Sequence, residues 1–197
     1  MPELLVVLTI LASLATVVAS QLNGRAGTAK ETITRATLGN LRTAIVDNYR
    51  ADQFETLPYP VDATRNQHPQ LTYLYVNPLT FVTGGVPGTI VWTYDPITHR
   101  GWSGPYVNNP GQYAVNVTRG FTANYGETGD PTPLDGWGNP IVLQQPLVIG
   151  SIASPTSLQY ARLVSAGPNG VLDTPPTTFL PTDLEMNDDL VLSLQAF

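Results

Sequence analysis

The sequence predicts an α+β fold, in which one long N-terminal α-helix packs on a C-terminal antiparallel β-sheet body with long loops. The first half of the helix is predicted to be apolar, because residues 4–19 carry no charge. The second half is predicted to be amphipathic, since apolar residues recur at helical spacing over 28–50. Of the 18 prolines, 17 lie beyond residue 57, where they separate short apolar runs that are typical of strands.

These patterns divide the 197-residue chain into an apolar helix segment at 1–27, an amphipathic helix segment at 28–57 and a β-rich globular head at 58–197. The charges follow the same division. Residues 1–57 carry five basic and five acidic side chains, so the net charge of −6 belongs to the head. An acidic chain with one lysine and no basic stripe is not expected to bind nucleic acid.

Several classes of chemistry are excluded or not expected. The chain has no cysteine, which excludes disulfides, thiolate zinc sites, iron–sulfur clusters and cysteine nucleophiles. It also lacks a phosphate-binding loop, a dinucleotide fingerprint and an H-E-x-x-H motif. We therefore expect a protein that is not an enzyme.

The first element, residues 4–19, is apolar on all faces. With Gln21 and Leu22 it reaches the lower edge of a membrane-spanning length, which is about 17–25 residues. The first basic residue, Arg25, follows the run, whereas a signal peptide begins with basic residues. We expect an N-terminal anchor helix; a buried core helix is the alternative.

The second element, residues 28–50, is predicted to be an amphipathic helix that lies on the globular head. Its predicted core-facing stripe consists of Ala29, Ile33, Ala36, Leu41, Ala44, Ile45 and Tyr49. Two glycines, Gly24 and Gly27, lie at the junction with the apolar run, and each costs about 1 kcal/mol in a helix interior. We therefore predict a bend or an unwound segment near residues 20–27.

The head is predicted to contain six strands. Each is a short run rich in β-branched, aromatic or aliphatic residues and bounded by Gly, Pro, Asn or Asp. The predicted strands are 71–76, 89–94, 112–117, 140–149, 157–166 and 190–194.

Glu3 stands at the start of the apolar run, where a carboxylate is costly unless it is paired. One interpretation is an interfacial glutamate at the aqueous end of an anchor. The other is an assembly contact, in which the carboxylate pairs with the free amino terminus of a neighbouring copy.

Several segments, which cover about a third of the chain, resemble the type IV pilin-like superfamily, and within it the major pseudopilins of type II secretion. The N-terminal segment ELLVVLTILASLATVV is similar to the first helix half of these proteins, although their glutamate is the fifth residue of the mature chain. The other similar segments are NLRTAIVDNYRADQ at 40–53, YDPITHRGWSGPYV at 94–107, DGWGNPIVL at 135–143, LVSAGPNGVLDT at 163–174 and NDDLVL at 187–192.

The resemblance implies a structural subunit of a pilus or pseudopilus filament. Its partners would be other copies in a helical homopolymer, together with an assembly platform and minor pilin-like subunits. The subunit would be anchored in the inner membrane before assembly and would lie in a periplasmic or extracellular filament afterwards. Glu3 would set the register of the packed helices.

The acidic C-terminus supplies the second candidate site. No basic residue follows Arg162, yet five acidic residues lie in the last 25 positions. Oxygen ligands alone suit a hard cation such as calcium, and the resemblance implies a calcium site in this loop. We assign it to Asp173, Asp183, Asn187, Asp188 and Asp189. The alternative is a solvated acidic loop without a metal ion.

Two other functions compete with the filament. A membrane-tethered periplasmic or surface binding module would share the anchor and the head but would not polymerise. A membrane-anchored hydrolase would need two facing carboxylates, for which Asp130 and Asp135 are the candidates in the middle of the head. Trp102 and Trp137, which lie beside glycines, are predicted to fill the core rather than to stack on sugars.

Overall fold

The computed structural model describes residues 2–53, 55–59, 68–81, 94–146 and 157–195, and within its long helix the side chains of residues 7–16 and 25–43. The chain begins with α1 (Pro2–Thr43), which continues as a π-helical turn η1 (Ala44–Tyr49) and ends in α2 (Arg50–Asp52).

The long helix differs from the sequence prediction at its middle. Residues 20–27 belong to α1 as regular α-helix, so the unwound segment predicted there is wrong. The glycine penalty is offset by good helix formers beside it, such as Gln21, Leu22 and Ala26. At about 1.5 Å per residue, the 42 residues of α1 extend over roughly 63 Å.

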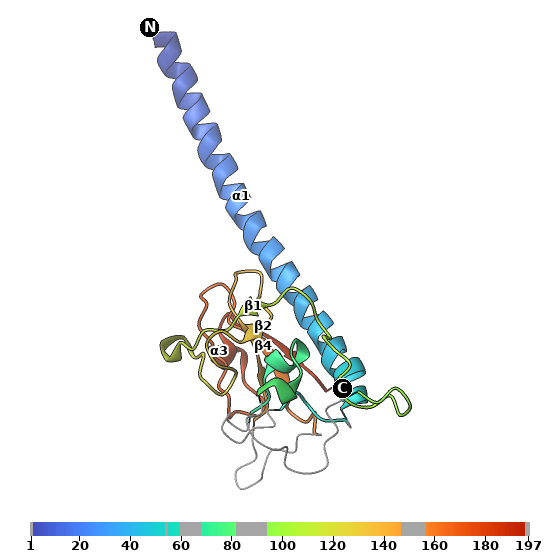
Figure 1. Ribbon diagram of the computed structural model, residues 1–197. Coiled ribbons are helices and arrows are strands. Elements are labelled where there is room, and N and C mark those ends of the chain that lie inside the picture. The colour runs from blue at the N-terminus through green and yellow to red at the C-terminus, as the bar shows by residue number, and fades with distance from the viewer. Residues whose placement is uncertain (1, 54, 60–67, 82–93, 147–156, 196–197) are drawn as a thin grey trace.

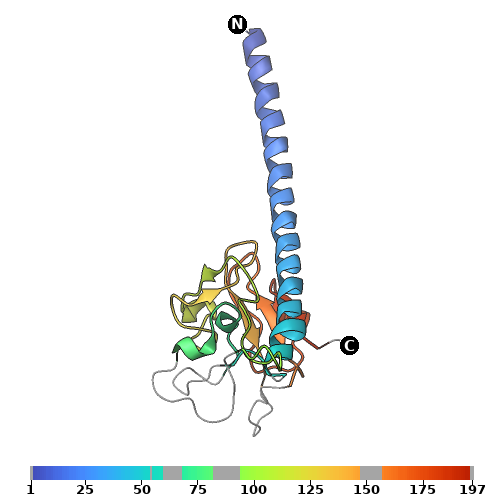
Figure 2. The ribbon, with the colours of Figure 1, turned by 45° about the vertical axis from the view of Figure 1, so that its right-hand side comes forward.

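The N-terminal half of α1 projects beyond the globular head, and its C-terminal half lies along the head (Figures 1 and 2). Among the described residues, no helix combines the length and the apolar character that crossing a membrane requires.

Two small antiparallel sheets among the described residues confirm the predicted α+β class. The larger sheet has the order β3–β4–β5 and consists of β3 (Ile141–Gln144), β4 (Arg162–Ser165) and β5 (Leu190–Ser193). Leu163 of β4 pairs with Leu143 on one side and with Leu192 on the other. The smaller sheet pairs β1 (Gly111–Gln112) with β2 (Pro131–Thr132).

Short helical turns make up the remaining described elements. They are η2 (Leu71–Leu74), η3 (Pro78–Phe81), η4 (Val117–Arg119) and α3 (Asp183–Met186). The strand predicted at 71–76 is therefore wrong. Its apolar run is a buried 3-10 turn, and periodicity cannot distinguish such a short run from a strand.

The other strand predictions are met to different degrees. Those at 140–149, 157–166 and 190–194 contain β3, β4 and β5 but extend beyond them. The prediction at 112–117 is wrong over most of its length, because β1 ends at Gln112 and only Asn116 forms a further bridge, to Phe121. The prediction at 89–94 falls mostly outside the described residues.

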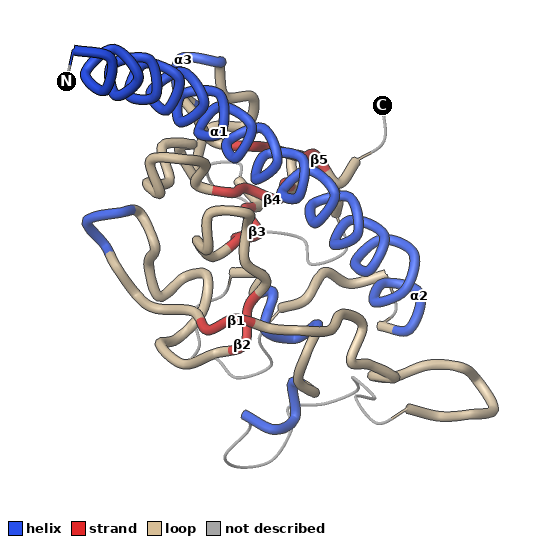
Figure 3. Tube along the Cα trace, turned by 90° about the horizontal axis from the view of Figure 1, so that it is seen from above, coloured by secondary structure: helices blue, strands red, loops and turns tan. Residues whose placement is uncertain are grey.

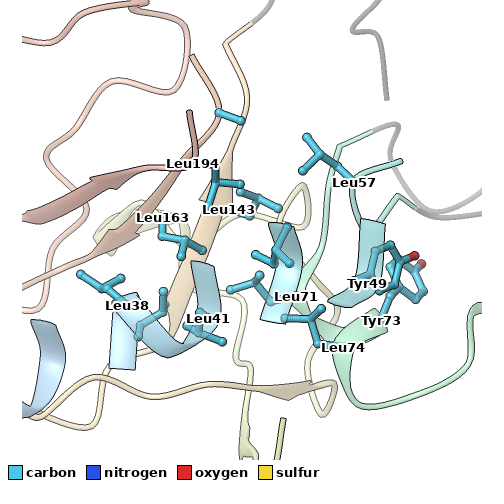
Figure 4. Close-up of a cluster of buried hydrophobic side chains, with 13 residues drawn as sticks. Leu38, Leu41, Tyr49, Leu57, Leu71, Tyr73, Leu74, Leu143, Leu163 and Leu194 are labelled. Carbon is cyan, nitrogen blue, oxygen red and sulfur yellow. The ribbon is translucent and has the colours of Figure 1, made fainter. Parts of the chain in front are cut away.

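The main hydrophobic core lies between α1 with η1 and the larger sheet (Figure 4). Leu38, Leu41 and Tyr49 contribute from the helix side, and Leu143 and Leu163 from the sheet. A second cluster lies on the other face of the sheet. It consists of Tyr113, Phe121, Val142, Val164 and Ala166.

The predicted core-facing stripe of the helix is only half right. Leu41, Ala44, Ile45 and Tyr49 are buried, whereas Ala29, Ile33 and Ala36 are exposed. Thr34 and Leu38 face the head instead. Over residues 29–38, the face of α1 that is buried against the head therefore differs from the face that carries Ala29, Ile33 and Ala36.

Candidate functional site

The acidic C-terminal loop meets the turn that follows β4. Asp173 comes shortly after this turn, the SAGPNG segment at 165–170, and Asp188 and Asp189 immediately precede β5. Gly167 has a φ of +58°, and a Cβ atom at this position would overlap the carbonyl oxygen of Asp188. Only glycine permits this close approach, which brings the two acidic segments together.

The carboxylates of Asp173, Asp188 and Asp189 form one cluster, with an oxygen of each within 4.8 Å of the others. Asp173 Oδ2 accepts hydrogen bonds from the side-chain amides of Asn169 and Asn187, each at 2.9 Å. Asp188 Oδ2 accepts from the Asn169 amide nitrogen at 2.9 Å, and Asp189 Oδ2 accepts from that of Thr174 at 2.7 Å. These donors fix the orientation of all three carboxylates.

Asp188 and Asp189 each have one carboxylate oxygen that accepts no hydrogen bond from the described residues. Asp188 Oδ1 and Asp189 Oδ1 are buried and have no hydrogen-bond partner in the described part of the chain. Burial raises the pKa of Asp189 to about 6, and the side chain is only 8% exposed. A buried carboxylate oxygen without a partner is unfavourable, so this geometry favours a compensating group such as a cation or a water molecule.

A calcium ion fits this donor set. Calcium binds oxygen ligands at about 2.3–2.6 Å, so two ligands on opposite sides of one ion can lie about 5 Å apart. The three carboxylates meet that limit, and they include the two unpartnered oxygens.

The structure brings together only part of the predicted ligand set. Asp173, Asp188 and Asp189 converge, whereas Asp183 is exposed in the first turn of α3 and is not a member of the cluster. Asn187 is a hydrogen-bond donor to Asp173. Asn169 was not predicted, although its position in the PNG turn beside Asp173 could have indicated it. The side chain of Glu3 lies outside the described side chains.

The DGWGN loop at 135–139 connects the acidic site to the helix. Asp135 Oδ1 accepts from the amide nitrogens of Trp137 and Asn139, at 2.9 and 2.8 Å, and Oδ2 accepts from the Ser165 hydroxyl at 2.7 Å. Asn139 Nδ2 donates to the Gly167 carbonyl at 3.1 Å. The carboxylate of Asp135 thus holds its own loop together and joins that loop to the segment that begins at Ser165.

The two carboxylates proposed for a hydrolase are both buried and both bind their own loops. Asp130 accepts from the Glu127 amide nitrogen at 2.9 Å, and Asp135 has the four donors of its own loop and of Ser165. These contacts account for both residues as structural groups. The tryptophans are half-buried rather than buried; Trp102 packs against the core and donates to the Tyr73 carbonyl at 2.9 Å.

Gly136 is the point at which this loop contacts α1. Its amide nitrogen donates to the Thr34 hydroxyl at 2.9 Å, and a Cβ atom would overlap the backbone carbonyl of Lys30. Since backbone cannot move aside as a side chain does, we expect Gly136→Ala to destabilise the fold by about 1–3 kcal/mol.

Chemical denaturation of Gly136→Ala tests this expectation, with Gly39→Ala as the control. A Cβ atom on Gly39 meets nothing within 4 Å, so this helix substitution should stabilise the protein by up to about 1 kcal/mol. Equal effects of the two substitutions would contradict the close contact at Lys30.

The projecting part of α1 is the second candidate site. Val7, Leu8, Ile10, Leu11 and Leu14 are each 53–57% exposed. Large exposed apolar side chains along one side of a helix form a surface that favours burial against other apolar groups. The described residues of the head do not cover them.

No family model, no curated protein and no solved structure matches this chain.

Proposed function

We propose that this protein is a structural subunit of a type IV pilin-like filament, a pilus or pseudopilus, which polymerises through its apolar N-terminal helix. One observation carries the proposal. A continuous helix extends beyond the head, and its large apolar side chains are exposed over the described residues 7–16. In a filament these side chains would pack against the same helix of neighbouring copies.

The driving force is physical rather than catalytic. Burial of apolar surface contributes about 25 cal/mol per Å², so a bundle of such helices would gain cohesion along its whole length. This cohesion is not directional, and Glu3 would supply the register. A carboxylate inside an apolar core tolerates only those arrangements in which it meets a cation, for example the amino terminus of a neighbouring copy.

The same proposal gives the location and the partners. Before assembly, the uncharged run at 4–19 would anchor the subunit in the inner membrane. Afterwards the subunit would lie in a periplasmic or extracellular filament, with an assembly platform and minor pilin-like subunits as further partners. The head would form the filament surface.

We also propose that calcium binds to Asp173, Asp188 and Asp189. The support is the pair of buried, unpartnered oxygens within this cluster. The ion would neutralise carboxylates that otherwise repel one another and would join the 165–174 segment to β5. Its role would be to stabilise the head, and Asp183 would not be a ligand.

Electron microscopy of material sheared from cells that express the full-length chain tests the filament. We expect uniform thin filaments, and we expect Glu3→Ala to abolish them because it removes the register contact. Glu31→Ala is a matched control, since Glu31 pairs with Arg35 of the same helix at 2.8 Å.

The possible results distinguish the filament from the role of Glu3 in it. Filaments that survive Glu3→Ala would retain the polymer and refute the role of Glu3. Dispersed, detergent-dependent particles in every sample would refute the polymer and favour the membrane-tethered binding module.

A further inference from the structure

We propose that cation binding at the acidic site is coupled, through the buried side chain of Arg162, to the position of the neighbouring loop at 175–179. The inference rests on the proposed calcium site and adds what binding at that site would control. It is based on a continuous series of hydrogen bonds, which begins at the carboxylate of Asp189 and ends at three carbonyl oxygens of the loop.

Arg162 is a buried cation that forms no ion pair with a described carboxylate. It lies on β4 and is 3% exposed. Its Nη2 donates to the Pro175 carbonyl at 2.7 Å, and its Nη1 donates to the carbonyls of Thr178 and Phe179 at 2.8 and 3.3 Å. A buried charge is unfavourable unless hydrogen-bonding groups surround it, so the loop carbonyls stabilise Arg162 only while the loop keeps its present course.

Gln144 connects the arginine to the acidic site. It lies opposite Arg162 in the register of β3 and β4, which run side by side in the larger sheet (Figure 3). Its Oε1 accepts from Arg162 Nε at 3.0 Å, and its Nε2 donates to the Thr174 carbonyl at 3.2 Å. Since a guanidinium only donates and a carbonyl only accepts, this amide has one orientation, and rotating it would break both bonds.

Thr174 completes the series with its backbone. Its amide nitrogen donates to Asp189 Oδ2 at 2.7 Å, while its carbonyl accepts from Gln144. The other oxygen of the same carboxylate, Asp189 Oδ1, is the buried atom without a partner, and the carboxylates of Asp173 and Asp188 lie beside it. One residue, which is 1% exposed, therefore joins the acidic cluster to the buried amide.

This series gives the acidic site and the loop a common preference. Without a cation, the Asp189 carboxylate has an unpartnered oxygen beside two like charges, which favours its withdrawal from the cluster and from the Thr174 amide. A bound cation neutralises the cluster and retains that bond, so that Gln144 and Arg162 also keep their partners. By thermodynamic reciprocity, whatever fixes the loop raises the affinity for the cation by the same factor.

The loop that Arg162 holds leads to the surface of the head. It continues through Leu180, which is 71% exposed, into α3, where Leu184 is 91% exposed. Cation binding would therefore fix an exposed segment of the head in addition to the acidic loop itself.

Hydrogen–deuterium exchange, measured by mass spectrometry on the purified full-length protein, tests the coupling with calcium as the probe. Relative to the chelator-treated protein, calcium should slow exchange roughly tenfold in peptides that cover 175–182. In this segment the Thr178 amide nitrogen donates to the Pro175 carbonyl at 3.4 Å. The turn at 95–100, which Arg100 ties to the Ala51 carbonyl at 2.7 Å, is the internal control, and its exchange should not change.

Arg162→Lys breaks the series at the loop. Lysine retains the charge, but one ammonium group cannot replace the fork of donors that reaches Gln144 and three carbonyls. We expect roughly tenfold weaker calcium binding in titration calorimetry, together with loss of the calcium-dependent protection of 175–182.

Two further variants keep the test independent of how well Arg162→Lys folds. Gln144→Glu can still accept from Arg162 but cannot donate to the Thr174 carbonyl, so it should also abolish the protection of 175–182 by calcium. Thr174→Val is the matched control. It keeps both backbone groups of the series and removes only a hydroxyl that is buried without a partner, so the protection should remain.

The outcomes separate the coupling from the calcium site. Calcium that raises the melting temperature but leaves the exchange of 175–182 unchanged would overturn the coupling and retain the site. An absence of both effects would overturn the site and the coupling together. Protection that survives in Arg162→Lys and Gln144→Glu would overturn the coupling through these two residues. None of these measurements requires filaments, so the filament is tested separately.

Discussion

Replacing Asp135 with alanine should destabilise the head by about 3–5 kcal/mol, because four donors lose a buried acceptor. The carboxylate is 6% exposed and accepts from two backbone amides, the Ser165 hydroxyl and the Asn139 side chain. For a chain of this size the melting temperature should fall by roughly 10 °C.

Asp135→Asn separates the hydrogen bonds within the loop from the hydrogen bond to Ser165. The substituted amide can still accept from Trp137 and Asn139 through one oxygen, but it places a donor beside the Ser165 hydroxyl. We therefore expect an intermediate loss in a thermal unfolding experiment. Asp95→Ala is the control, since Asp95 accepts similar hydrogen bonds from Ile97 and Thr98 in an exposed loop. If Asp95→Ala and Asp135→Ala lowered the melting temperature equally, the structural role of Asp135 would be contradicted.

The sequence predicted those elements whose pattern is local. The strands β3, β4 and β5 are apolar runs bounded by turn residues, which is the pattern that predicted them, whereas their pairing in one antiparallel sheet is a finding of the structure. The run LTYL at 71–74 has the same composition, but tertiary packing made it a 3-10 turn with all four residues buried. Composition alone could not separate these two cases.

The orientation of the helix depended on contacts that no local pattern contains. The Gly136 loop contacts α1 at Lys30 and Thr34, which selects the helix face that lies on the head and leaves Ile33 outside. The π-helical turn at Ala44–Tyr49 then changes the spacing, so a constant helical period cannot describe the whole element.

Composition drew attention to the acidic C-terminus, the family resemblance implied the set of ligands, and the geometry corrected that set. The aspartates beside the SAGPNG turn converge, because Gly167 allows the close approach of the Asp188 backbone. Asp183 looked equivalent in sequence but begins α3, where its position depends on the course of the loop at 174–182. Spacing along the chain gives no information on that course.

Adding calcium to the purified metal-free protein should raise its melting temperature. Binding to the folded state alone stabilises by about 2.7 kcal/mol when the free ion is at 100 times its dissociation constant, which corresponds to roughly 5–10 °C for this chain length. Magnesium should have a smaller effect at equal concentration, because it dehydrates reluctantly and demands octahedral geometry. An equal response to both ions would argue for screening of an acidic loop rather than for a binding site.

Single substitutions then identify the ligands. Asp189→Asn should abolish the calcium response without destabilising the metal-free protein, because the amide oxygen can still accept from the Thr174 amide nitrogen while one of three close charges is removed. Asp183→Asn should leave the calcium response intact, since Asp183 lies outside the cluster. The two substitutions remove the same charge from the same acidic segment, so they change its overall charge equally. A response lost in both would refute the three-aspartate site, whereas a response lost only in Asp189→Asn would attribute the effect to the buried oxygen that the fold leaves without a partner.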